Sequence, residues 1–85
     1  MIIRRKFGDT LSGPIKNLVH DKYYDSLTFI EKDEKAAQKT RAAALMYIGR
    51  NDLGLTTSVN KNRIVVMKNK DVVGNQLIVD LRNAI

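Results

Sequence analysis

The sequence contains no cysteine and no tryptophan, and it has only one proline among its 85 residues. Without cysteine the chain can form no disulfide, no thiolate nucleophile and no cysteine-based zinc or iron–sulfur site. Small secreted domains usually depend on disulfides, so we expect a protein of a reducing compartment, the cytoplasm. We expect residues 1–85 to form a single domain of thin stability, because a chain of this size buries only about 60–65 % of the surface that it exposes when unfolded.

Long apolar runs are also absent. No stretch approaches the ~20 apolar residues that a membrane-spanning helix needs. The N-terminal run Met1–Lys6 places its charges after two apolar residues, with no apolar segment behind them, which does not match a signal peptide. We therefore expect no membrane segment and no membrane partner. The chain also shows no internal repeat, no low-complexity run and no linker.

Catalytic and metal-binding groups are sparse. His20 is the single histidine, and it does not form a dyad with Asp21 by default, because adjacent residues of a helix or strand face different ways. Glu31, Asp33 and Glu34 lack the spacing of a calcium loop and suit the positive end of a helix dipole. No glycine-rich phosphate loop or serine nucleophile motif is present. We predict a protein that is not an enzyme and has no cofactor and no metal.

The clearest predicted element is a helix from about Lys32 or Asp33 to Arg50. Acidic residues open it, and Asn51 to Gly54 ends it with residues that tolerate a left-handed cap. Its inward face is rich in alanine, and small residues let a helix lie close to a sheet. The expected inward residues are Ala36, Ala37, Thr40, Ala43, Ala44, Tyr47 and Ile48.

The remaining patterns predict mostly strands. Residues 2–7 alternate weakly, 23–30 are rich in β-formers, and 55–59 with 63–68 form a hairpin around the turn 60–62. A short helix is expected near residues 12–19. Arg63–Met67 has apolar residues on both faces, which indicates a central strand.

The C-terminal segment fits two structures. Leu77, Val79 and Leu81 alternate as in a strand, interrupted only by Ile78. A helix is favoured, because the run is long and Asp71 and Asn75 are usable caps. In either case the segment presents a large apolar face, and we interpret it as closing the core or meeting a second subunit. The expected oligomer-interface residues are Leu77, Ile78, Leu81 and Ile85, while Val73 completes the helical face.

These elements together predict an α+β domain in which one long helix packs on a small antiparallel sheet. The expected order is strand, short helix, strand, long helix, two strands of a hairpin, and a C-terminal helix or strand.

The charge is one-sided, with fifteen Lys and Arg against nine Asp and Glu, a formal net charge of +6. Residues 1–30, 31–50 and 51–85 each carry five basic and three acidic side chains, so each segment contributes +2. Because the excess is even along the chain, only the fold can build a basic patch. Such a balance favours acidic partners.

Basic clusters stand in the acid-free stretch before Asp9 and in the acid-free stretch between Asp52 and Asp71. Their cations are suited to phosphate contacts, and the second stretch includes the tip of the hairpin. The alternative is that these charges only keep the protein soluble. A helix stripe of Lys32, Lys35, Lys39 and Arg50 is interpreted as a solvated face. The predicted nucleic-acid-binding residues are Arg4, Arg5, Lys6, Lys61, Arg63, Lys68 and Lys70.

Aromatic residues bear on the type of nucleic acid. Single-strand binders stack bases on exposed aromatics, but Phe29 and Tyr47 fit the core here. Tyr23 and Tyr24 place one ring on each side of their segment, so one of them is expected to be exposed. This pattern favours phosphate contacts with duplex DNA.

The stretch from Asp25 to Lys68 resembles short uncharacterised bacteriophage proteins of the α+β class. In that pattern a strand like Ser26–Ile30 leads into an alanine-rich helix with a mid-helix arginine, here Arg41, and a strand like Arg63–Lys68 closes the unit. The chain departs from it in lacking a tryptophan near the end of the closing strand and in having an extra C-terminal element. The resemblance implies a protein that works in the cytoplasm of a bacterial host and either binds DNA or takes over a host protein.

Three functions remain open from the sequence. The first is a non-enzymatic accessory protein that binds duplex DNA through phosphate contacts. The second is a small phage-type effector that binds and inhibits a host protein, such as the transcription machinery or a defence enzyme. The third is a structural homodimer joined by the C-terminal segment, which is compatible with the first because two copies double the basic surface.

Overall fold

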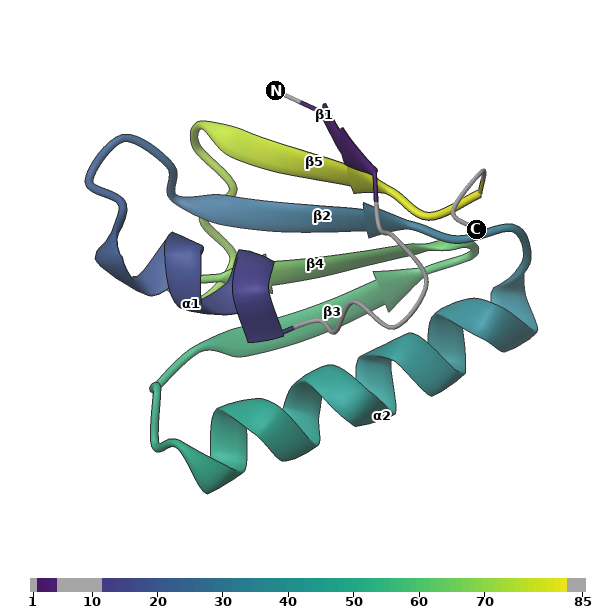
Figure 1. Ribbon diagram of the computed structural model, residues 1–85, viewed down its shortest axis with the longest axis horizontal. Helices are drawn as coiled ribbons and strands as arrows, with labels where there is room; N and C mark the ends of the chain where they lie inside the picture. The colour runs from purple at the N-terminus through teal and green to yellow at the C-terminus, as the bar shows by residue number, and fades with distance from the viewer. Residues whose placement is uncertain (1, 5–11, 83–85) are drawn as a thin grey trace.

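The computed structural model describes residues 2–4 and 12–82. Two helices and five strands follow one another along the chain (Figure 1). Their bounds are β1 Ile2–Arg4, α1 Ser12–His20, β2 Ser26–Ile30, α2 Glu34–Arg50, β3 Thr56–Asn60, β4 Arg63–Met67 and β5 Gln76–Asp80. This content confirms the predicted α+β class.

The five strands form one sheet in the order β1-β5-β2-β4-β3. The hairpin β3–β4 and the pair β2–β4 are antiparallel, whereas β5 runs parallel to both β1 and β2. The sheet is therefore mixed, and the expectation of an antiparallel sheet is wrong for the half that contains β5. The reason is that the loop after β4 crosses β2 and turns the chain back, so β5 runs opposite to β4 and parallel to β2. Strand β1 runs the same way, because helix α1 returns the chain to the same end of the sheet before β2 begins.

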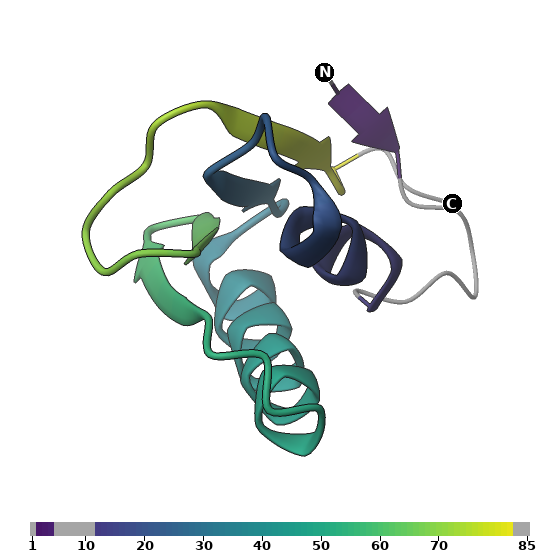
Figure 2. The ribbon, with the colours of Figure 1, turned by 90° about the vertical axis from the view of Figure 1, so that its left-hand side faces the viewer.

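Both helices lie on the same side of this sheet (Figure 2). Residues paired across neighbouring strands point to the same face, so the side chains opposite Leu27 and Phe29 share their face. That face packs against α1 and α2 to form the core. The core residues with no exposed surface include Ile15, Leu18, Leu27, Phe29, Ala37, Ala44, Ile64, Val66 and Leu77.

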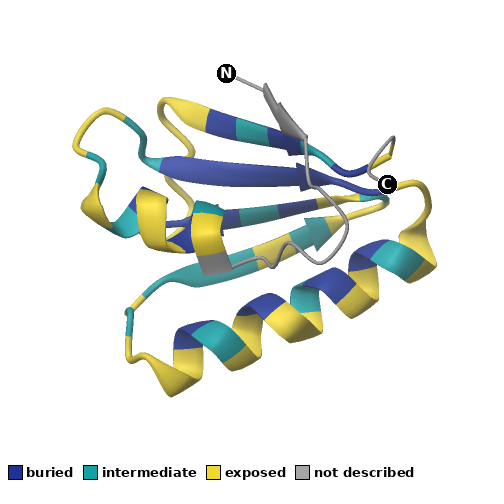
Figure 3. Cartoon of the chain, in the orientation of Figure 1, coloured by how far each residue is buried: buried dark blue, intermediate teal, exposed yellow. Residues whose placement is uncertain are grey.

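The other face of the sheet carries no helix among the described residues. Its centre is the row of Thr28, Val65 and Ile78, in which Thr28 is buried and its two neighbours are half-buried. All five residues of β2 are buried, so both faces of this strand are covered (Figure 3). The alternation of residues 26–29 in the sequence is typical of a half-buried strand. The difference arises because β2 is the middle strand and β4 and β5 flank it on both sides.

Helix α2 begins one or two residues later than expected, with Asp33 as its N-cap. The Asp33 Oδ1 atom accepts a hydrogen bond of 2.8 Å from the Ala36 backbone N–H, which satisfies one of the free N–H groups at a helix start. The inward face is nearly as predicted, since Ala37, Thr40, Ala44 and Ile48 are buried. The exception is that Ala43 is exposed.

The C-terminal segment forms strand β5 rather than the favoured helix. Leu77 and Val79 lie in the core opposite Leu27 and Phe29 of β2, so the alternation of the strand pattern decides the structure. The predicted helical face that included Val73 is wrong, because Val73 is exposed and belongs to the loop before β5. A helix cap at Asp71 or Asn75 was wrong for the same reason.

The loop of residues 68–75 joins β4 to β5 across the start of β2, which lies between them. It is tied to the loop 21–25, because Asp25 N–H donates to the Asn75 carbonyl at 2.7 Å and Asp25 Oδ2 accepts from Asn75 N–H at 3.1 Å. Gly74 makes this tie possible with a φ of +54°. No helix of the described residues is long and apolar enough to cross a membrane.

Candidate nucleic-acid interface

One end of the sheet collects the ends of all five strands. The register places Ile30 of β2 opposite both Arg63 of β4 and Asp80 of β5, and Asp80 opposite Arg4 of β1. Arg4 of the predicted N-terminal cluster and Arg63 of the predicted hairpin cluster therefore lie in one cross-strand row. Of the N-terminal cluster only Arg4 is described, by its backbone, and Arg5 and Lys6 lie outside the described residues.

Four exposed cations stand at this end and are called here the basic end: Lys32, Lys61, Arg63 and Arg82. Lys32 follows β2, Lys61 lies in the β3–β4 turn, Arg63 opens β4 and Arg82 follows β5. They come from segments up to fifty residues apart in the chain, and the parallel and antiparallel pairings bring them to the same edge of the sheet.

The turn that carries Lys61 has an unfavourable backbone. Asn60 and Arg63 form the last pair of the hairpin, so Lys61 and Asn62 make a two-residue turn. The φ of Lys61 is +56°, in the left-handed region where a non-glycine residue costs about 1–2 kcal/mol. Glycine is the residue that such a turn favours. A lysine at this position keeps an exposed cation at the tip at some cost in stability.

Asp80 partly neutralises the basic end. Its carboxylate accepts from Arg82 Nη2 at 2.8 Å and from Arg82 Nε at 3.0 Å, and this hydrogen-bonded contact raises the pKa of Arg82 above its ordinary value. It is the only ion pair between described side chains. Lys32, Lys61 and Arg63 consequently have no carboxylate partner among the described residues and keep their full charge toward solvent.

Three further acids lie close by, at the start of α2, and each suits a local role there. Glu31 is 7 % exposed and accepts a hydrogen bond from the Thr40 hydroxyl. Asp33 caps α2, and Glu34 lies in its first turn near the positive end of the helix dipole. These acids belong to the helix side of the sheet. Arg63 belongs to the opposite, helix-free face, so a polyanion meets fewer acids when it approaches from that face.

Lys68 and Lys70, the other two predicted contacts, lie at the far end of β4. Arg63 and Met67 are the two ends of that strand, about 13 Å apart, and both lysines follow Met67. Lys68 is half-buried, and its Nζ donates a hydrogen bond to the Asp21 carbonyl. It therefore helps to hold the loops 21–25 and 68–75 together. The structure therefore splits the predicted hairpin cluster into two ends.

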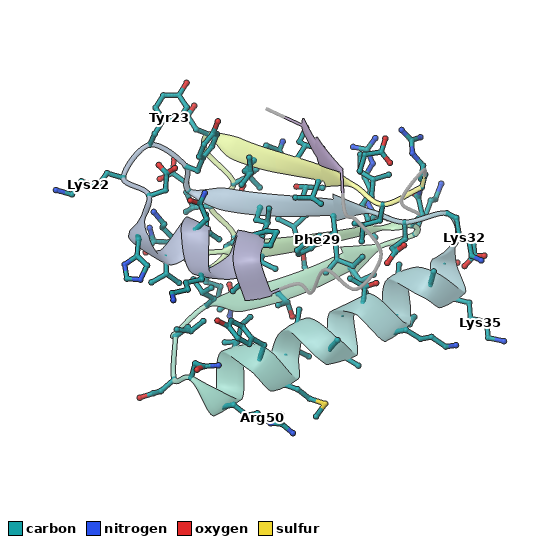
Figure 4. All side chains as sticks on the ribbon, in the orientation of Figure 1. Lys22, Tyr23, Phe29, Lys32, Lys35 and Arg50 are labelled. Carbon is teal, nitrogen blue, oxygen red and sulfur yellow. The ribbon has the colours of Figure 1, made fainter. Side chains whose placement is uncertain are left out.

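Among the described residues, no exposed aromatic ring lies at the basic end. Tyr23 is 65 % exposed and contacts Tyr24 edge to face with ring centroids 5.0 Å apart. Figure 4 shows Tyr23 and Lys22 at the opposite end of the molecule from Lys32. The helix-free face of β2 to β5 holds no aromatic side chain, since Phe29 points to the core. The described surface thus offers no platform for stacking bases next to the basic end.

The predicted oligomer-interface residues are mostly used inside the monomer. Leu77 has no exposed surface and Leu81 is 5 % exposed, and both belong to the core cluster. Ile78 is half-buried on the helix-free face, and Ile85 lies outside the described residues. The expectation of an exposed C-terminal face was wrong for Leu77 and Leu81, because β5 is an inner strand of the sheet.

The other candidate residues show no built site. His20 is exposed at the end of α1. Within residues 2–4 and 12–82 no three acidic or histidine side chains are grouped closely enough to hold a metal ion.

Sequence reasoning missed Lys32 and Arg82 as members of the basic end. Lys32 was assigned to the solvated helix stripe, and Arg82 was not singled out. Both follow the last residue of a strand by two positions. This spacing is visible in the sequence, but it becomes a signal only once β2 and β5 are known to be parallel neighbours.

No protein family matches this chain, and searches of curated proteins and of solved structures also find no match.

Proposed function

We propose that this protein is a non-enzymatic nucleic-acid-binding accessory protein that contacts the phosphates of duplex DNA through its basic end. The observation that carries the proposal is the convergence of Lys32, Lys61 and Arg63 at one edge of the sheet, none with a carboxylate partner among the described residues. Phosphate contacts use such exposed cations and need no pocket.

The shape of the hairpin suits this role. A two-residue turn projects Lys61 beyond the last pair of the hairpin, with Asn60 and Asn62 on either side and Arg63 next to it. A narrow, acid-free tip can approach a groove or a phosphate backbone without like-charge repulsion from its own residues. The amide side chain of Asn62 donates to the Glu31 carbonyl at 2.9 Å, which fixes the tip to the end of β2.

The choice of duplex over single-stranded nucleic acid rests on the aromatic residues. Single-strand binding without sequence preference usually combines cations with stacking aromatics. Here the exposed Tyr23 and the basic end are at opposite ends of the molecule. Phosphate contact alone remains, and a duplex offers the denser array of phosphates.

The test compares two double variants that lose the same charge. Lys61→Gln with Arg63→Gln removes two cations at the basic end, and Lys22→Gln with Lys70→Gln removes two exposed cations at the other end. Binding to a labelled duplex of about 20 base pairs is measured by fluorescence anisotropy between about 50 and 200 mM salt. Over this range the affinity of a protein that contacts phosphates falls steeply.

The basic-end variant should lower the slope of log K against log salt by about 2, since each phosphate contact contributes about 0.9. The control variant should leave the slope and the affinity nearly unchanged. Equal losses in both variants would show that the bulk charge, and not the basic end, attracts DNA. An affinity that does not depend on salt would contradict phosphate binding altogether.

A further inference from the structure

The outer side of α2 has an apolar half that no residue among 2–4 and 12–82 covers. Its exposed residues Ala42, Ala43, Leu45, Met46 and Gly49 are called here the α2 patch. Leu45 is 40 % exposed and Met46 is 57 % exposed, and they are two of the five exposed large hydrophobic residues among those described. Figure 3 shows the exposed band along α2 on the side away from the sheet.

The α2 patch is not needed to hold the helix in place. Ala37, Thr40, Ala44 and Ile48 fix α2 to the sheet from its other side, and Asp33 caps its start. Polar residues at positions 45 and 46 would therefore cost no core packing, and their apolar character is available for another contact.

The composition of the patch fits a second helix. Ala42, Ala43 and Gly49 leave little side chain above the helix surface, so another helix axis can come close, and packed helices lie about 8–10 Å apart. Met46 adapts its shape to different partners. Leu45 lies one residue before Met46 and adds a branched apolar contact on the same outer side.

The rim of the patch is basic. Lys35 and Lys39 lie on the N-terminal side of the patch and Arg50 on its C-terminal side, and all three are exposed, with Glu34 as the acid at the far N-terminal end. Figure 4 shows Lys35 and Arg50 near the two ends of the helix. A partner that covers the patch meets three cations around an apolar centre, so its own flanks must be acidic for the charges to complement.

We propose that the α2 patch docks an amphipathic helix of a partner protein, with apolar residues along its middle and acidic residues on its flanks. This is a helix laid along a helix, in which the apolar stripe supplies affinity and the charged rim supplies orientation and specificity. A second copy of this chain is a poor occupant, because it would place its own Lys35, Lys39 and Arg50 against the same cations of the first copy.

Other polyanions fit the α2 patch less well. A phosphate backbone offers no apolar surface to cover Leu45 and Met46. A lipid surface needs several large apolar side chains to insert, whereas the patch has two and is otherwise small. The docking function is independent of the basic end, so one protein can hold DNA and a partner at the same time.

The probe is a fluorescein-labelled helical peptide of 21 residues with leucines along one face and glutamates flanking them, at a concentration where it is monomeric. A second peptide has lysines in place of the glutamates. The test variant is Leu45→Gln with Met46→Gln, and the matched control is Val72→Gln with Val73→Gln, which changes two other exposed aliphatic residues in the loop before β5. Thermal melts by circular dichroism check that all proteins are folded.

The glutamate peptide should bind the parent protein, the lysine peptide should bind at least tenfold more weakly, and the test variant should lose at least tenfold in affinity while the control does not. The test variant should keep its affinity for duplex DNA. The proposal would be overturned if both peptides bound with equal affinity, or if Leu45→Gln with Met46→Gln left the affinity for the glutamate peptide unchanged. It would also be overturned if the test variant abolished a dimer seen by sedimentation, or binding to anionic phosphatidylserine vesicles, since a second copy or a lipid surface would then be the occupant.

Discussion

Replacement of Leu77 by alanine tests where the C-terminal segment lies. Leu77 has no exposed surface and sits on β5 opposite Leu27. The substitution removes three carbons, which is about 2.4 kcal/mol of transfer free energy at ~0.8 kcal/mol each, and the remaining cavity adds to this. We expect a loss of about 2.5–5 kcal/mol in the free energy of unfolding.

The neighbouring residue Ile78 provides the matched control. It lies on the same strand but points to the helix-free face, where it is half-buried. Since up to about a third of its surface is already in water, Ile78→Ala should cost less than Leu77→Ala, about 1.5 kcal/mol. A domain of this size has a total stability of only about 4–13 kcal/mol, so the two variants should differ visibly.

Urea unfolding followed by far-ultraviolet circular dichroism measures both. With a slope of about 1–1.5 kcal/mol per molar urea, a loss of about 3 kcal/mol lowers the midpoint for Leu77→Ala by roughly 2–3 M, and the midpoint of Ile78→Ala falls by only about 1–1.5 M. In a thermal scan the same loss corresponds to roughly 12–24 °C. Unchanged unfolding of Leu77→Ala together with a loss of oligomers would refute the core position of β5.

Three further predictions concern backbone and caps. Gly74→Ala should destabilise the fold by more than Gly54→Ala, because both have positive φ but a Cβ at Gly74 would collide with the Asp25 carboxylate, with Cγ only 2.7 Å away; the two urea midpoints decide this. Asp33→Ala should lower stability by about 1 kcal/mol through loss of the α2 cap, and an unchanged midpoint would mean that the cap contributes nothing. Lys61→Gly should raise stability by about 0.5–1 kcal/mol by relieving the left-handed φ and yet weaken DNA binding, a combination that a purely structural turn would not show.

Local patterns decided the parts of the fold that the sequence could predict. The α2 helix has its own signals in the acidic start, the inward alanines and the Asn-containing end, and the hairpin has alternating strands around Asn60–Asn62. Each of these signals acts within about fifteen residues, so no knowledge of distant partners was required.

The C-terminal strand shows where local patterns stop being sufficient. The segment around Leu77 fits a helix and a strand almost equally, and its structure is decided by β1 and β2, between which it inserts. Residues 2–4 and 26–30 are far away in sequence, and parallel pairing leaves no turn signal such as a hairpin does. The mixed character of the sheet was missed for the same reason.

The basic end was predictable only in part. Arg63 and Lys61 were identified by the absence of acids nearby in the sequence, and the register places Arg4 in the same row. Lys68 and Lys70 were grouped with them by sequence distance, whereas an extended strand separates its two ends by its full length. Charged residues that are close in the sequence therefore stay close in space at a turn, but they are separated when an extended strand lies between them.

The most direct test of the basic end is a titration of the ¹⁵N-labelled protein with duplex DNA, followed by amide chemical-shift changes. The proposed contact predicts the largest changes at Lys32, at Lys61 to Arg63 and at Arg82, with little change at Lys22 and Lys70. Changes centred on Lys22 and Lys70, or spread evenly over all exposed lysines and arginines, would contradict it.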